Sequence, residues 1–160
     1  MEIDTVEIVP ATPAYIPEIV ELWLELMDIH KEISPYFARS EDAATHFEDH
    51  INEWISKEDT QVLVALYNNT VVAYSIAEVL NRPPLFKERT FGFISDLAVK
   101  SEYRRKGIGG KMLEKMFEWF KSRNLHRIHL QVVPQNDMAC SFWKKHGFCE
   151  HMHTLYMIRD

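Results

Sequence analysis

The sequence predicts an α/β fold with one mixed sheet of six to seven strands and about four helices. The first observation is a nearly continuous apolar strand over residues 91–99, followed at residue 108 by an amphipathic helix. The second is a pair of strands at residues 61–67 and 70–79, close enough together to form a hairpin. With helical stripes on both sides of this group, the patterns indicate a single domain over residues 1–160.

The N-terminal part is expected to contain one short strand and two helices. The strand covers residues 6–9, and Thr12-Pro13 then supplies a helix cap with proline at the first helical position. An apolar stripe continues this helix to about residue 30, and a second stripe predicts a helix over residues 42–56. The stretch between them, residues 30–42, is irregular and rich in aromatic residues.

The remaining elements alternate between strand and helix. The Asn-Asn pair at residues 68–69 tolerates the positive φ of a tight hairpin turn. After the helix that starts at residue 108, a strand is predicted over residues 127–133 and a short helix over residues 136–145, ended by Gly147. One or two closing strands are expected over residues 148–158.

Composition is that of an ordinary globular protein, with 46% hydrophobic and 26% charged residues. No apolar run reaches membrane-spanning length, and no signal peptide is apparent at the N-terminus. The two cysteines, Cys140 and Cys149, make no disulfide framework, so a reducing cytoplasmic location is expected.

Charge is unevenly distributed within the net charge of −6. Residues 1–60 hold 15 acidic and 3 basic side chains, whereas residues 61–160 hold 9 acidic and 15 basic ones. The basic part suits a polyanionic ligand and the acidic part a cationic one, although surface charge also drifts along chains without a role. Overall acidity, and the absence of a basic stripe with interleaved aromatic residues, argue against nucleic-acid binding.

A basic, glycine-containing turn precedes the helix that begins at residue 108. Such a turn can present unpaired backbone N–H groups and the positive end of the helix dipole to a phosphate or pyrophosphate. It is neither a Walker loop nor a dinucleotide fingerprint, since Met112 stands where the latter needs Gly or Ala. The candidate phosphate-binding residues are Arg104, Arg105, Lys106, Gly107, Ile108, Gly109 and Gly110.

Two motifs resemble those of one family. Arg-x-x-Gly-x-Gly at 104–109, after a strand ending Asp-Leu-Ala-Val, resembles the acetyl-CoA-binding signature of the GCN5-related N-acetyltransferase (GNAT) superfamily. The segment from Asn136 to Phe148 resembles that family's later motif, Asn-x-x-Ala-x-x-Phe-Tyr-x-Lys-x-Gly-Phe. The resemblance covers essentially the whole chain and is strongest over residues 91–148. It implies a mostly antiparallel sheet and acetyl-CoA as cosubstrate, with no metal.

The resemblance also assigns cofactor contacts. The backbone of Leu97, Ala98 and Val99 would pair with the pantetheine arm, and one of their amides would polarise the thioester carbonyl. The amides from Arg105 to Gly110 would hold the pyrophosphate. Asn136 matches an asparagine that contacts the pantetheine arm, although it suits a helix cap equally well.

Acyl transfer to an amine needs a proton acceptor, because amines with a pKa of roughly 10.4 are protonated at neutral pH. Asp96, the only acid in the central strand, is the leading candidate, with a purely structural role as the alternative. Relatives often carry a glutamate one position earlier, where this chain has Ser95. Glu78, on the neighbouring strand, is the second candidate.

Trp143 stands where many relatives carry a tyrosine thought to protonate the departing thiolate. An indole offers an N–H donor but no phenol-like acid, so the alternatives are a hydrogen bond to sulfur, unaided departure, or packing alone. Cys140 lies on the same helical face and is interpreted as a free cysteine. The histidines and Cys149 between residues 146 and 153 fit no zinc template, and no metal site is predicted.

The sequence thus predicts an acetyl-CoA-dependent N-acetyltransferase whose acceptor is a polyamine-like small amine or a peptide amine. Residues 30–42 and the two acidic helices are expected to line the acceptor pocket. The alternative is a CoA-binding sensor that has lost turnover, supported by Ser95 and Trp143 at catalytic places. A sheet-edge homodimer is compatible with the resemblance.

Overall fold

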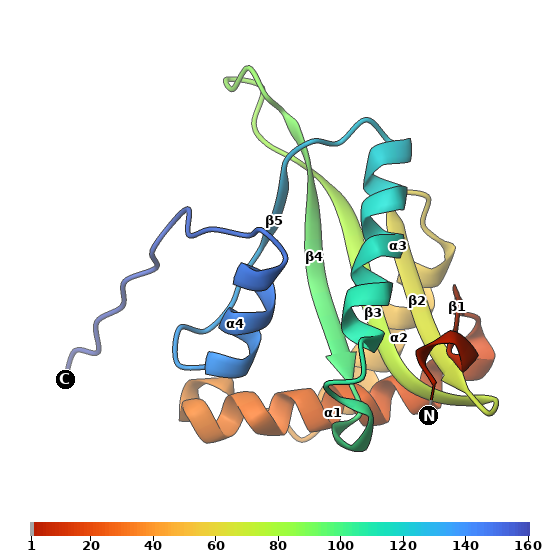
Figure 1. Cartoon of the computed structure of the whole chain (residues 1–160). Helices are drawn as coiled ribbons and strands as arrows, with labels where there is room; N and C mark the ends of the chain where they lie inside the picture. Colours follow the sequence, from red (N-terminus) through yellow and green to blue (C-terminus); the bar gives the residue numbers. More distant parts are fainter. Residues whose placement is uncertain (1) are drawn as a thin grey trace.

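The computed structural model of the chain describes residues 2–160 and contains one mixed sheet in the order β1-β2-β3-β4-β5 (Figure 1). Strands β1 to β4 are antiparallel to their neighbours, and β5 is parallel to β4. Short 3₁₀ helices lie at Ile3–Thr5, Pro13–Tyr15, Pro35–Phe37 and Ser101–Tyr103. The main elements are β1 Glu7–Pro10, α1 Ile16–Ile33, α2 Ala43–Ser56, β2 Thr60–Tyr67, β3 Thr70–Asn81, β4 Thr90–Val99, α3 Ile108–Ser122, β5 Ile128–Leu130 and α4 Asp137–Lys145.

Helices cover the two faces of the sheet with separate apolar cores (Figure 1). The buried stripe of α3, predicted from its periodicity, packs on one face against residues such as Leu63 and Val72. On the other face, α1 and α2 pack against Val64, Tyr74 and Ile76. The buried helix residues are Ile108, Met112, Leu113, Met116 and Phe120 on the first face, and Ile16, Ile19, Leu22, Phe47 and Ile51 on the second.

The predicted elements before residue 91 are confirmed with small shifts of their ends. Asn68 and Asn69 both adopt positive φ, 49° and 61°, in the turn between β2 and β3. The α-helix expected to begin at Thr12-Pro13 starts at Ile16, because Pro13–Tyr15 first forms a 3₁₀ turn.

A β-bulge divides β4 into two parts. Ile76 of β3 pairs with Asp96, but the next residue, Ala77, pairs with Ile94, so Ser95 has no partner on β3. Only Gly92–Ile94 pair with β5, through Ile128–Leu130. The strand predicted over residues 127–133 therefore ends at Leu130, because β4 changes course at the bulge and no longer runs beside it.

The strands expected over residues 148–158 are absent. Residues 149–160 are extended, and among the described residues no backbone hydrogen bond holds them. The described chain therefore has five strands rather than six to seven. The apolar pattern favours a strand, but a strand forms only beside a neighbour, and after Phe148 the chain turns away from the sheet (Figure 1). Met152, Leu155, Tyr156, Met157 and Ile158 consequently remain 80–90% exposed.

Within residues 2–160, no helix combines the length and apolar character needed to cross a membrane.

Candidate active site

The second part of β4, residues 95–99, offers an open backbone edge. It pairs with β3 on one side, whereas on the other side no strand of the described chain pairs with it. Figure 1 shows β4 and β5 separating beyond the point where their pairing ends. This edge includes Leu97, Ala98 and Val99, the residues assigned to the pantetheine arm. Apart from the Val99 carbonyl, which accepts from Arg104, its unpaired groups remain free to bind an extended amide-containing ligand.

The turn between β4 and α3 presents a run of unpartnered amides. Arg105 and Gly107 adopt positive φ, 57° and 85°, which reverses the chain just before Ile108 begins the helix. Among the described residues, the N–H groups of residues 105–110 donate to no acceptor, while that of Lys111 already bonds to Gly107. Consecutive free amides at the positive end of a helix form a concave anion site, so this turn suits a pyrophosphate.

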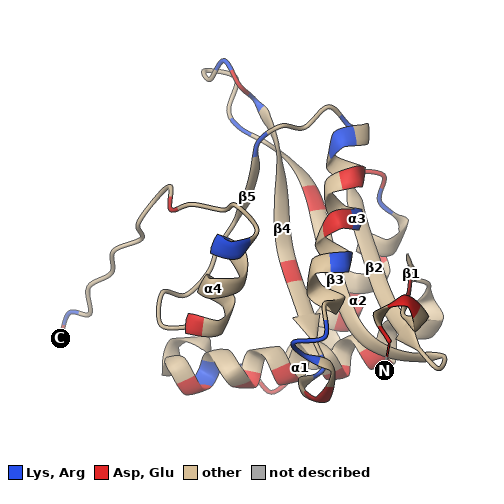
Figure 2. Ribbon diagram, in the orientation of Figure 1, with Lys and Arg blue, Asp and Glu red and all other residues tan. Residues whose placement is uncertain are grey.

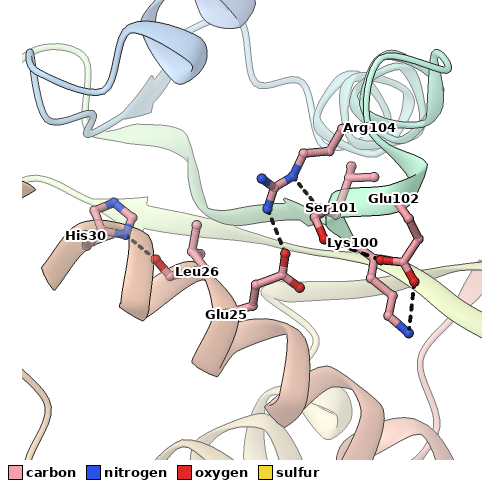
Figure 3. A network of polar contacts seen from close by, with 8 residues as sticks. Glu25, Leu26, His30, Lys100, Ser101, Glu102 and Arg104 are labelled. Atoms are coloured by element: carbon pink, nitrogen blue, oxygen red, sulfur yellow. Dashed lines mark hydrogen bonds and ion pairs between the residues drawn. The ribbon is translucent and has the colours of Figure 1, made fainter. Parts of the chain in front are cut away.

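Arg104 is directed away from that site. Its Nε donates to the carbonyl oxygen of Val99 at 2.8 Å, and its Nη2 lies 3.1 Å from Oε1 of Glu25 on α1 (Figure 3). The guanidinium thus fixes the turn to the end of β4 and to α1. Arg105 and Lys106 remain exposed and are the cationic side chains free to meet a phosphate.

The helix α1 and the turn before α3 carry opposite charge. Acidic side chains recur along α1, and basic ones gather at the turn before α3 (Figure 2). Next to the Arg104–Glu25 pair, Lys100 lies 3.6 Å from Glu102, which also accepts a hydrogen bond from Ser101 (Figure 3). Ion pairs within the turn and between the turn and α1 therefore flank this segment, while its backbone amides remain free.

Asp96 lies on the sheet face covered by α1 and α2. Its Oδ2 accepts a hydrogen bond of 2.9 Å from the hydroxyl of Tyr74, a fully buried residue of β3. Burial raises the pKa of Asp96 from 3.8 to about 7, the Tyr74 hydrogen bond lowers it, and the charge of Glu78 raises it. A carboxyl group that titrates near neutrality suits a general base. The pKa of Tyr74 is raised well above its usual value, mainly by burial, so this phenol remains a donor.

Glu78 and Ser95, on neighbouring strands, contact each other directly. The Ser95 hydroxyl donates to Oε2 of Glu78, and both residues are partly buried. The two carboxylates predicted from sequence are thus brought to the same region of the sheet, one held by Tyr74 and the other by Ser95.

Helix α4 packs against the start of α3. A Cβ at Gly109 would lie 3.2 Å from Cε2 of Phe142, and one at Gly110 would lie 3.4 Å from Cε1 of His146. Asn136 caps α4, its side chain accepting a 3.2 Å hydrogen bond from the amide of Ala139. Close packing by α4 explains why small residues stand at the first turn of α3.

Trp143 sits among aromatic rings. Its centroid lies 4.9 Å from that of Phe142 and 5.3 Å from that of Phe148, both edge-on. Its indole N–H has no hydrogen-bond partner among the described residues. These contacts support a packing role for Trp143. Among the described residues, no side chain is placed to help its indole N–H donate a proton.

Sequence reasoning missed Tyr74 and the Ser95–Glu78 contact. Tyr74 occurs in an apolar strand where nothing distinguishes it from other core residues. The alternation of residues 74, 76 and 78 on one strand face could have placed Tyr74 beside Glu78. The bulge that places Ser95 and Asp96 on that same face leaves no mark in the sequence.

A shallow hollow of about 220 Å³ lies between α1 and the start of β3. It contains neither Asp96, Glu78 nor Trp143, and it does not involve the predicted acceptor segment 30–42. Its lining residues are Glu18, Glu21, Leu22, Glu25, Thr70, Val71 and Lys100. Among the described residues, no group of three or more His, Cys, Asp or Glu side chains is arranged to hold a metal ion.

A split sheet whose open strand leads into a helix start with unpartnered amides is an α/β arrangement suited to an extended, phosphate-containing ligand. The profile of the acetyltransferase (GNAT) family matches residues 23–148, and the chain therefore belongs to this family of N-acetyltransferases.

Individual relatives support the same family. N-alpha-acetyltransferase 30 of Schizosaccharomyces pombe is 29% identical over 148 residues, which cover 91% of this chain and 85% of that protein. Streptothricin acetyltransferase A of Bacillus subtilis is 38% identical over 58 residues, 36% of this chain and 34% of that protein, so the match spans about a third of that relative. The crystal structure of a mutant BH1408 protein from Bacillus halodurans has a TM-score of 0.88 at 25% identity, covering 96% of this chain and 99% of that one.

Proposed function

We propose that this protein transfers the acetyl group of acetyl-CoA to a primary amine. The observation that carries the proposal is the continuous path from the unpaired edge of β4, residues 95–99, to the unpartnered amides of residues 105–110. A ligand with an extended arm containing amides and a pyrophosphate at its end matches both parts. The pantetheine arm of CoA has amides that can pair with a strand edge, and its pyrophosphate suits free N–H groups.

Acetyl-CoA supplies an acyl group that is already activated as a thioester. On the protein side, Leu97, Ala98 and Val99 would align the arm, and an amide of this segment would stabilise negative charge on the acyl oxygen. Arg105 and Lys106 would add positive charge near the pyrophosphate. Asn136, already a helix cap, is proposed as a further contact of the arm.

Asp96 is proposed as the general base. Its carboxylate takes a proton from the acceptor ammonium, and the neutral amine then attacks the thioester carbonyl. The new C–N bond forms as the C–S bond breaks, the nitrogen releases its second proton, and the CoA thiolate takes up a proton. Trp143 is not assigned as the acid, because an indole does not give up its N–H under these conditions.

The acceptor is proposed to be cationic. Residues 1–60 have a balance of 15 acidic to 3 basic side chains, and this part of the chain forms α1 and α2 beside the face that holds Asp96. A polyamine-like small molecule and a peptide amine both fit. The names of the relatives point the same way, since one is an N-alpha-acetyltransferase and another a streptothricin acetyltransferase. We propose a cytoplasmic location, and a homodimer stays a prediction.

The test is a steady-state assay of free CoA release with a panel of amines, including spermidine and peptides with a free N-terminus. Turnover with any amine, together with a rise in Tm on addition of acetyl-CoA, supports the proposal. Binding of acetyl-CoA with no turnover above the rate without enzyme would contradict it. That outcome would favour a CoA-binding sensor, for which the packed Trp143 is the structural argument.

A further inference from the structure

The bulge in β4 places two consecutive polar side chains on one face of the sheet. In a regular strand, neighbouring side chains point to opposite faces. Here Ser95 and Asp96 both lie opposite Ile76, because the extra residue leaves one β3 position facing two on β4. A regular strand would direct one of these two side chains into the α3 core instead.

The hydrogen bonds agree with this geometry. Asp96 accepts from the hydroxyl of Tyr74, and Ser95 donates to the carboxylate of Glu78. Tyr74, Ile76 and Glu78 alternate along β3 and so share one face, which is the face covered by α1 and α2. Two carboxylates from adjacent strands therefore lie on the same face. After burial, the charge of Glu78 is the other cause that raises the pKa of Asp96.

Each carboxylate retains unused acceptor capacity. An ionised carboxylate has about four acceptor positions, and each of these groups receives one hydrogen bond from a described side chain. The charged neighbours are few. Glu78 raises the pKa of Asp96, and it also contributes to the raised pKa of exposed Lys57, at the end of α2. An ammonium group between the two carboxylates would relieve their repulsion and satisfy their open positions.

We propose that Ser95 is a positioning residue that holds the Glu78 carboxylate beside Asp96, so that Glu78 binds the acceptor ammonium while Asp96 takes its proton. This inference rests on the proposed function and assigns a different role to each of the two acids. The ammonium R–NH₃⁺ gives one proton to Asp96 and becomes R–NH₂, while Glu78 remains ionised. Without the serine hydroxyl, the three rotatable bonds of Glu78 would let its carboxylate move toward solvent and Lys57.

The first test follows Asp96 directly, by ¹³C NMR titration of side-chain carboxyls in the full-length protein. Ser95→Ala should lower the pKa of Asp96 as Glu78→Gln does, because in both variants the neighbouring negative charge is displaced or removed. The double variant should match Glu78→Gln alone, and Ser95→Thr, which keeps a hydroxyl, should resemble wild type. A Ser95→Ala protein that titrates like wild type, while Glu78→Gln does not, would overturn the positioning role.

The second test adds spermidine, and separately a hexapeptide with a free N-terminal amine, to the same titration. At least one of these amines should lower the pKa of Asp96 in wild type, and the effect should be lost in Glu78→Gln. If neither amine changes the pKa of Asp96, the proposal that Glu78 and Asp96 bind an ammonium group is wrong. This readout needs no turnover, so it separates failure of the inference from failure of the proposed acetyl transfer.

Kinetics with the better of those two amines then distinguish binding from proton transfer. Glu78→Gln should raise KM by about 10- to 100-fold, and Ser95→Ala by about three- to tenfold, the range for charged and neutral hydrogen bonds. In both variants kcat should change less than KM. Ser95→Thr, which keeps a hydroxyl, should have a KM close to that of wild type. Ser122→Ala, which removes an exposed hydroxyl bonded to Trp119 at the end of α3, is the matched control. A loss confined to kcat would contradict the assignment of Glu78 to binding.

Discussion

The two parts of β4 have the same strand conformation but different surroundings. Residues 92–94 lie between β3 and β5, and Gly92 there packs directly against Phe120 of α3. Residues 95–99 pair with β3 alone and lead into the turn of free amides. The bulge at Ser95 is the boundary between them.

This difference shows how one strand serves both stability and ligand binding. In the enclosed part, residues 92–94 pair with a strand on each side and Gly92 and Ile94 are buried, so substitutions at these two positions should alter the free energy of unfolding. The open part retains unpaired groups and one partly buried acid, Asp96, so substitutions there should alter binding or catalysis with smaller effects on folding. Asp96→Asn and Gly92→Ala test this division, and Gly109→Glu and Trp143→Phe test the site into which the open part leads.

The largest effect is expected at Asp96, in the open part. Asp96→Asn should reduce kcat by about 10²–10⁴, the range for loss of a general base, while acetyl-CoA binding is retained. In wild type, kcat/KM should rise as the pH increases through about 7, since Asp96 must lose its proton to act. The variant should lack this rise, as measured by initial rates across pH. An unchanged rate and pH profile would direct attention to Glu78 instead.

The same carboxyl group makes a prediction about stability. Its folded pKa of about 7 lies above the ordinary value of 3.8, so between these values the folded state holds a proton that the unfolded state releases. Stability from this group is therefore present at low pH and lost as the pH rises toward 7. Asp96→Asn should remove this part of the pH dependence in urea unfolding. A variant with the wild-type slope would show that Asp96 titrates normally in the folded protein.

The next effect concerns the amide turn. Gly109→Glu should abolish the Tm shift caused by acetyl-CoA, since a negative charge in the first turn of α3 would repel the phosphates. At a ligand concentration of 100 Kd, this is a loss of about 2.7 kcal/mol of stabilisation. Gly109→Ala is the control. Its Cβ would press on Cε2 of Phe142 at 3.2 Å but adds no charge, so most of the shift should survive. If folded Gly109→Glu still shows the full Tm shift, the pyrophosphate does not bind at this turn.

A smaller effect, in the enclosed part, should appear in stability alone. A Cβ at Gly92 would lie 2.6 Å from Cε1 of the fully buried Phe120, so Gly92→Ala should lower the free energy of unfolding by about 1–3 kcal/mol. Denaturant unfolding without ligand measures this. Gly110→Ala, whose Cβ meets only the edge of His146 at 3.4 Å, is the control and should change stability less. Equal stability of the two variants would contradict the division of β4.

The smallest effect is expected at Trp143. Its ring packs between Phe142 and Phe148 with no partner for the indole N–H, so Trp143→Phe should keep kcat within about threefold, or about 0.6 kcal/mol of activation free energy. Initial-rate kinetics at saturating acetyl-CoA measure this. A loss of several orders of magnitude with unchanged binding would show that the N–H acts on the departing sulfur.

Local patterns in the sequence were sufficient to predict most of the fold and the elements that carry the candidate site. The amphipathic stripe of α3, the Asn68-Asn69 turn and the glycine-containing turn each depend on residues close together in the chain, and each was found where predicted. Asp96 and Glu78 also lie on adjacent strands, as predicted.

Features that depend on residues far apart were not predictable in this way. The Arg104–Glu25 pair joins positions 79 residues apart, so a basic triplet in the sequence does not reveal that one member turns away. The early end of β5 follows from the bulge at Ser95, which is set by pairing between strands. The strands wrongly expected over residues 148–158 illustrate the same limit, because pattern alone cannot supply a partner strand.

The extended segment after Phe148 has a practical consequence for handling the protein. Proteases accept substrates as extended backbone that no internal hydrogen bonds hold, and residues 149–160 already have this form. Leu155 and Tyr156, both exposed, are side chains that chymotrypsin prefers. Brief digestion should therefore shorten the chain at this end first and leave the sheet and its helices intact, since neither apolar core contains a residue beyond Phe148.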